Sequence, residues 1–253
     1  MRLEQFNGAL DTTVDVPLGT WAAATLLGHA RTITNERRHG THDRGSVGNR
    51  NVDLWGAFTE LLLLRVVRNL HDSDDARRYI ESGLFDPRGG TATKGRPDLE
   101  FVDGRTIGVD AKSFNCIRGY KLFAIAASKH DDLRGHCDGY FTAIVPEFGK
   151  RAVLAKLVPY ADVEEWPRGH LRFEWDDDAG AFKRDKDDAK IPRGNESRHI
   201  PIEDFTARYC SARVDLDALR EDQYDPKDVE ELARDAKLRK SLLQTAPNLK
   251  DYI

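Results

Sequence analysis

Residues 139–148, GYFTAIVPEF, restrict the fold more than any other stretch, because nearly every side chain in this run is apolar. A strand with one wet face would alternate apolar and polar residues. A nearly continuous apolar run is instead typical of a strand buried on both faces inside a sheet. The stretch therefore predicts the interior strand of an α/β protein.

A long apolar helix is predicted over residues 51–70, with Asn51 or Asp53 as its N-cap. Glu60 projects from the apolar surface of this helix. Because an unpaired buried carboxylate is costly, Glu60 needs a cation, a cage of hydrogen bonds or a raised pKa. The alternative without a function is an ion pair with a nearby arginine.

Residues 20–34 carry an earlier helical pattern, and residues 35–50 contain three glycines without any periodicity. The second stretch predicts a loop, which Arg37, Arg38 and Arg44 make basic. Two interpretations stay open, namely a mobile arm that contacts DNA phosphates and a solvated connector.

The remaining elements are less sharply marked. An apolar stripe predicts a helix within residues 118–135, and residues 150–160 predict a strand. Residues 161–199 are polar and predict a surface hairpin and loop, followed by a strand at HIPIEDF. An amphipathic helix is predicted from Pro226 onward. We expect one domain, and the alternative is a small separate module that begins near residue 161.

Composition narrows the classes of protein. The chain has 253 residues, 40% of them hydrophobic, which is enough for a core. Its 39 Lys and Arg against 43 Asp and Glu do not by themselves indicate a nucleic-acid binder, so a polyanion site needs local basic clusters. We expect a cytoplasmic protein, since there is neither a signal-peptide pattern nor an apolar run of roughly 20 residues. Three scattered cysteines (Cys116, Cys137, Cys210) predict neither a disulfide framework nor a standard zinc site.

Residues 95–114, GRPDLEFVDGRTIGVDAKSF, predict a β-hairpin. Asp110 and Lys112 are two positions apart on its second strand, so their side chains share one face. Asp98, at the start of the first strand, shares that face only if the turn has an odd number of residues. Gly104 suits the left-handed position of a three-residue loop, which would end there and pair residue 101 with 105.

Two carboxylates that converge in this way repel each other unless a cation lies between them. Mg²⁺ fits, because it binds one or two protein carboxylates and leaves positions for water and phosphate oxygens. The Ala111 carbonyl is a further oxygen ligand, and Lys112 can act on an attacking water or stabilise charge on the phosphate. These residues therefore predict phosphodiester hydrolysis.

The run Pro97-Asp98, eleven residues and Asp110-Ala111-Lys112, with Glu60 on the preceding helix, resembles the PD-(D/E)xK nuclease superfamily. The resemblance covers about residues 51–160, less than half the chain. It implies a restriction-endonuclease-like core, in which helices flank a central mixed β-sheet in the order αβββαβ. Residues 1–50 and 161–253 would be additions to this core, and the strand expected before Pro97 is poorly marked.

The resemblance also implies roles for single residues. Asp98 and Asp110 would bind Mg²⁺, Lys112 would act on the nucleophilic water, and Glu60 would assist as an outer metal ligand or through water. The crossover helix would contribute Ser128 or Lys129. The residues expected to contact DNA are Lys94, Arg96, Lys129, Arg37, Arg38 and Arg44.

The sequence thus predicts a Mg²⁺-dependent endonuclease for double-stranded DNA, most like a type II restriction or phage-defence enzyme. Because this fold commonly cuts two strands with two active sites, the resemblance implies a homodimer, and a cognate DNA methyltransferase would be a further partner. Three alternatives stay open. They are a structure-specific repair or recombination nuclease, a non-catalytic DNA-binding subunit, and an α/β protein in which Asp110 and Lys112 form a surface ion pair.

Overall fold

The apolar run is confirmed as a strand, β5 (Gly139–Val145), whose side chains are all buried in the computed structural model. The structure describes residues 2–39, 45–70, 95–115, 122–170, 174–176, 181–183 and 196–245. The other strands of the same sheet are β1 (Thr12–Asp15), β2 (Leu99–Asp103), β3 (Arg105–Asn115), β6 (Arg151–Leu154) and β7 (Val158–Pro159). Their order is β1-β6-β5-β3-β2, and β7 also pairs with β5.

The sheet is mixed, as predicted. β3 and β5 run parallel, with Asp110 beside Tyr140 and Lys112 beside Thr142. The other pairs in this sheet, including the β2–β3 hairpin, are antiparallel.

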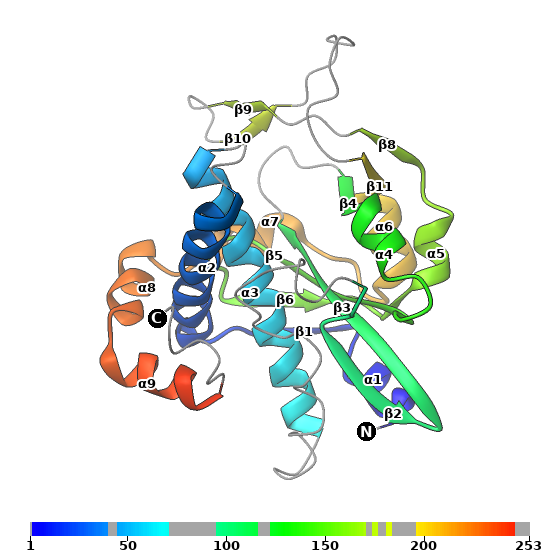
Figure 1. Ribbon diagram of the computed structural model, residues 1–253, viewed down its shortest axis with the longest axis horizontal. Coiled ribbons are helices and arrows are strands. Elements are labelled where there is room, and N and C mark those ends of the chain that lie inside the picture. The colour runs from blue at the N-terminus through cyan, green and yellow to red at the C-terminus, as the bar shows by residue number, and fades with distance from the viewer. Residues whose placement is uncertain are drawn as a thin grey trace.

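Helices cover both faces of this sheet (Figure 1). The long helices α2 (Leu18–His39) and α3 (Gly45–Leu70) lie on one face, and α4 (Ala127–Asp132), α5 (Tyr160–Glu164) and α6 (Ile202–Tyr209) lie on the other. Along β5, Phe141 and Ala143 join the apolar cluster of α2 and α3, whereas Tyr140 and Ile144 join the opposite cluster. The two faces explain why the strand needs apolar side chains at almost every position.

α2 and α3 approach each other closely at Gly28. A Cβ atom built at this position would lie 2.7 Å from the backbone of Leu54. Only glycine therefore allows the observed distance between the two helices, and this distance determines which side chains of α2 reach α3.

The loop predicted over residues 35–50 is largely wrong. α2 continues to His39 and α3 begins at Gly45, so only residues 40–44 fall outside the described part of the chain. The segment Asn35 to Arg38 has no glycine or proline, and Glu and Arg favour helix, so nothing in it ends α2. The N-cap predicted at Asn51 or Asp53 is also wrong, because both residues lie inside α3.

The helix predicted within residues 118–135 is wrong over its first half. Leu122–Ala126 form strand β4, in which buried and partly buried residues alternate, and α4 follows directly. β4 belongs to a second, three-stranded sheet with the order β4-β11-β8, formed with β8 (Arg168–His170) and β11 (Glu196–Pro201).

The C-terminal predictions hold in part. The polar hairpin is present as β9 (Glu174–Asp176) and β10 (Ala181–Lys183), which pair antiparallel. The stretch HIPIEDF, residues 199–205, is a strand only as far as Pro201, and α6 begins at the next residue. The terminal helix divides into α8 (Pro226–Ala233) and α9 (Ala236–Thr245), while α1 (Leu3–Gly8) and α7 (Leu216–Glu221) are short. Among the described residues, no helix has the length and apolar character to cross a membrane.

Candidate active site

The β2–β3 hairpin brings Asp98 and Asp110 to opposing positions. Leu99 pairs with Val109, so the preceding residue, Asp98, stands across from Asp110. The predicted odd loop is confirmed, but it is centred on Gly104 rather than ending there, because residue 103 pairs with 105. Gly104 has φ +69°, the left-handed conformation expected of it.

Asp98 is held against the neighbouring strand by its own carboxylate. Oδ2 accepts a hydrogen bond of 2.7 Å from the backbone N–H of Ala111. Removal from water and the negative charges of Asp110 and Glu60 raise the pKa of Asp98 to about 8. The carboxylates therefore repel one another, as the sequence indicates.

Asp110 is a buried carboxylate held by two lysines. Its side chain is 0% exposed, and its Oδ2 pairs with Lys112 while its Oδ1 lies 3.3 Å from the Nζ of Lys129. Oδ1 has no hydrogen bond of good geometry. Burial alone would raise the pKa of Asp110, but the charges of Lys112 and Lys129 outweigh it and the pKa is lowered. A surface ion pair, one of the alternatives above, does not describe this buried contact.

Lys112 is placed between the strand and an aromatic ring. Its Nζ also lies 3.2 Å from the carbonyl oxygen of Ala111, the oxygen predicted as a metal ligand. The same Nζ is 5.9 Å from the centre of the Tyr140 ring, within the range of a cation–π contact. The ammonium group is thus held on the face of the sheet that carries Asp110.

Lys129, rather than Ser128, reaches the site from the short helix α4, since Ser128 is exposed. The helix is fastened by its buried neighbour His130, whose Nδ1 lies 2.7 Å from the hydroxyl of Tyr140. The ring of Tyr160 stacks on His130 with 4.0 Å between centroids. Burial lowers the pKa of His130 to about 4, so the ring is neutral near pH 7.

Glu60 has the arginine partner that the sequence left open. Both carboxylate oxygens accept hydrogen bonds from Nη2 of Arg31 on α2, at 2.7 and 2.5 Å. Arg31 is not among the site residues predicted from the sequence, although it is the single Lys, Arg, Asp or Glu in residues 20–34. A lone charged residue in an apolar helix pattern is the signal that could have found it.

The basic residues predicted to contact DNA are described only in part. Arg96 is exposed, next to Pro97. Lys94 and Arg44 lie outside the described residues, and so does the strand expected before Pro97. The backbone of Arg37 and Arg38 belongs to α2, while their side chains are not described.

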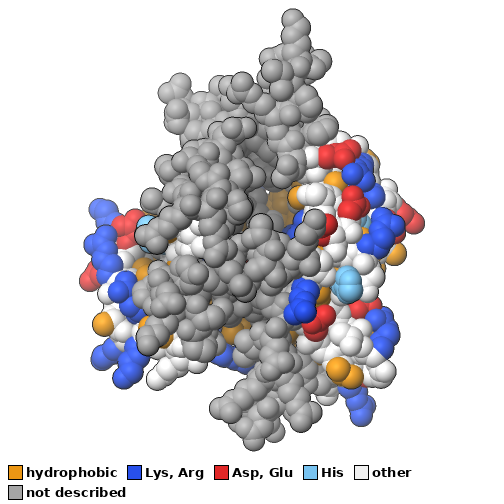
Figure 2. Space-filling view, in the orientation of Figure 1, with side chains coloured by type: hydrophobic (Ala, Val, Ile, Leu, Met, Phe, Trp, Pro, Cys, Tyr) orange, Lys and Arg blue, Asp and Glu red, His pale blue; other side chains and the backbone are white. Residues whose placement is uncertain are grey.

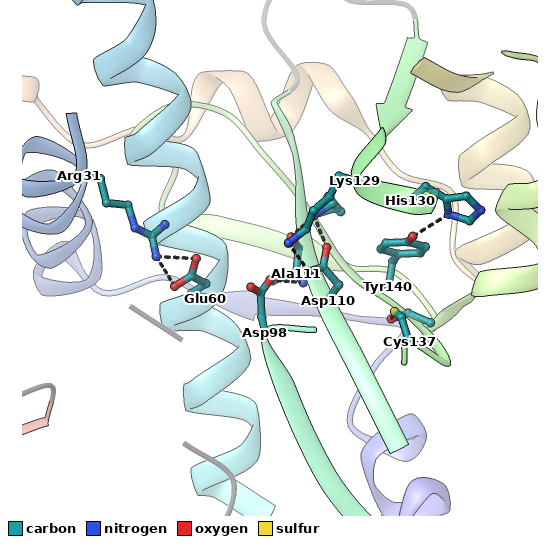
Figure 3. Close-up of polar contacts among 11 residues, drawn as sticks. Arg31, Glu60, Asp98, Asp110, Ala111, Lys129, His130, Cys137 and Tyr140 are labelled. Carbon is teal, nitrogen blue, oxygen red and sulfur yellow. Dashed lines mark hydrogen bonds and ion pairs between the residues drawn. The ribbon is translucent and has the colours of Figure 1, made fainter. Parts of the chain in front are cut away.

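The site as a whole is a cluster of acidic and basic side chains, in which Arg31 meets Glu60 at one end and Lys129 meets Asp110 at the other (Figure 3). Its three acids are Glu60, Asp98 and Asp110, and its three bases are Arg31, Lys112 and Lys129. In the described ranges, no group of three or more His, Cys, Asp or Glu side chains is placed so that it could by itself hold a metal ion. The donor set nevertheless fits Mg²⁺, because two carboxylates meet and one buried oxygen, Oδ1 of Asp110, lacks a hydrogen bond.

Comparisons of the chain with protein-family models, with curated proteins and with solved structures returned no match. The chemistry of the site must therefore be inferred from its own geometry.

Proposed function

We propose that the chain is a Mg²⁺-dependent DNA endonuclease with a PD-(D/E)xK core. One observation carries the proposal. Asp98 and Asp110 stand at opposing positions of two neighbouring strands, and Lys112 follows Asp110 on the same face. Carboxylates held this close, with an ammonium group beside them, are unfavourable as mere structural elements and suited to bind a divalent ion next to a phosphate.

The order of elements supports the same proposal. The helix that carries Glu60 is followed by the β2–β3 hairpin, by α4, and by the buried strand β5 beside β3. This matches the order expected for the core except for its first strand, which would fall outside the described residues, while β4 pairs outside the central sheet.

The residues of the site have distinct roles in phosphodiester hydrolysis. Asp98 and Asp110 would hold Mg²⁺, which supplies a Lewis acid and lowers the pKa of a bound water. Lys112 and Lys129 hold two positive charges at the place where negative charge develops on the phosphate, and they donate hydrogen bonds to its oxygens. His130 and Tyr140 keep α4, and with it Lys129, at the sheet.

Neither net charge nor the mixed surface charge selects a nucleic acid as the substrate, so this part of the proposal depends on the positive charges of the site itself. Figure 2 shows Lys and Arg side chains interspersed with Asp and Glu over the described parts of one face. The chain carries a formal charge of −4, so attraction of a phosphate backbone depends on the lysines of the site and on nearby residues such as Arg96. Double-stranded DNA, a homodimer and a restriction or defence role extend the proposal along the family resemblance.

A cleavage assay tests the proposal. The protein is incubated with plasmid and phage DNA in Mg²⁺ or in EDTA, beside Lys112→Met and Lys156→Met. Lys156 is the matched control, because it is a half-exposed lysine paired with Asp11 at 3.6 Å and takes no part in the site. We expect cleavage by the parent and by Lys156→Met in Mg²⁺ only, and at least a hundredfold loss of rate in Lys112→Met.

Two results would refute the proposal. One is equal cleavage by Lys112→Met and the parent. The other is a parent protein that cleaves no DNA and shows no thermal stabilisation by Mg²⁺, since the carboxylate pair then holds no metal.

A further inference from the structure

Arg31 is a buried cation at the edge of the site to which the proposed hydrolysis gives no role. We infer that Arg31 is a fixed positive charge that neutralises the carboxylate of Glu60 and thereby limits the site to one divalent cation. The inference rests on the proposed function, because it concerns the metal content of the same site.

The contact between Arg31 and Glu60 is built into the packing of two helices. The side chains are 12% and 8% exposed, and a single guanidinium nitrogen binds both carboxylate oxygens. Gly56 lies one helical turn before Glu60 on α3, and a Cβ there would come within 3.2 Å of Nη1 of Arg31. The glycine thus leaves room for the guanidinium, and the close approach of the helices at Gly28 encloses it.

The charges of the site explain why the pair matters for metal binding. Three ionised acids and three bases balance, so one divalent cation, which displaces the proton of Asp98 when it binds, leaves two positive charges for the phosphates of the substrate. A second divalent cation would raise the net positive charge of the site to four. Such a charge is strongly unfavourable in a place shielded from water.

The three bases differ in how freely their side chains can move away from their acidic partners. Lys112 and Lys129 are 22% and 32% exposed and can turn toward a phosphate. Arg31 is enclosed between α2 and α3, and the negative charges of Glu60, Asp98 and Asp53 outweigh its burial and raise its pKa. Its charge is therefore permanent, and Glu60 contributes no net attraction for a cation.

The test counts Mn²⁺ ions bound without DNA, by isothermal titration calorimetry and by electron paramagnetic resonance of free Mn²⁺. The parent and Arg31→Lys should bind one ion. Arg31→Gln should bind two, because the neutral amide still donates a hydrogen bond to Glu60 but leaves the site with one uncompensated acid. Two ions bound by the parent, or one ion bound by a folded Arg31→Gln protein, would overturn the inference.

A double variant keeps the inference testable if Arg31→Gln does not fold. Arg31→Gln with Glu60→Gln replaces the buried ion pair by two neutral amides, a change that proteins often tolerate. We expect it to bind one Mn²⁺ with the affinity of the parent. A tenfold weaker affinity would show that Glu60 is itself a ligand and would overturn the role given to Arg31.

The outcome for the parent separates this inference from the proposed function. A parent that binds no Mn²⁺ at millimolar concentration removes the metal site and the nuclease proposal together. A parent with one ion, and Arg31→Gln also with one, removes only the role of Arg31.

Discussion

Replacement of Asp98 by Asn should make the metal-free protein less sensitive to pH. Asn has nearly the same shape, and its Oδ1 can still accept the hydrogen bond from the N–H of Ala111. What changes is the charge that faces Asp110 and Glu60 on one side and Lys112 and Lys129 on the other. The variant therefore isolates the titration of one carboxyl group.

The expected size of the effect follows from the pKa of Asp98, which is about 8 in the folded state and 3.8 for an aspartate in water. Between these values the folded protein binds a proton that the unfolded chain has lost, so rising pH destabilises the fold. The slope is about 1.4 kcal/mol per pH unit. From pH 6 to pH 7.5 the parent should lose about 2 kcal/mol relative to Asp98→Asn, which corresponds to roughly 4–8 °C in Tm for a chain of this length.

Thermal and urea unfolding of both proteins in EDTA, over this pH range, measures the difference, and groups common to both cancel. Saturating Mg²⁺ should remove most of the pH dependence in the parent, because the metal replaces the proton between the carboxylates. Parallel stability curves for parent and variant in EDTA would refute the reasoning, since Asp98 would then be ionised throughout and its repulsion by Asp110 unimportant.

Two further predictions concern packing and charge. Gly108→Ala should destabilise the protein by about 3 kcal/mol or more in urea unfolding, because its Cβ would lie 1.9 Å from the carbonyl oxygen of His136; Gly8→Ala, with open space around it, is the control, and equal effects would contradict the prediction. Lys112→Met and Lys129→Met should each leave Asp110 with one ammonium partner, whereas the double variant leaves it with neither. The double variant should lose about 1–3 kcal/mol more than the sum of the two single losses, and strict additivity would show that the lysines act independently.

The hairpin and its shared face could be predicted from sequence because the information is local. The period of two along β3 and the preference of Gly104 for positive φ together decide which side chains meet. The buried strand β5 was equally plain, since few other elements need apolar side chains on two faces.

The partner of Glu60 could not be predicted in the same way. Arg31 lies 29 positions away, and its contact depends on how closely α2 and α3 approach at Gly28, which no periodicity reveals. The strand β4 was missed for a related reason, because five residues of Leu, Phe, Ala and Ile fit a helix or a strand alike. Its pairing with β11, more than 70 residues later, decides between them.

The helix α4 is attached to the central sheet in two ways that differ in permanence. The ion pair between Lys129 and Asp110 can be exchanged for contacts with a phosphate or a cation, because both partners belong to the proposed chemistry. The stack of His130 on Tyr160 and its hydrogen bond to Tyr140 involve neutral groups that no such exchange disturbs. The helix thus has one contact that can be exchanged and one that is retained, so ions could be exchanged during the proposed hydrolysis while α4 stays attached to the scaffold.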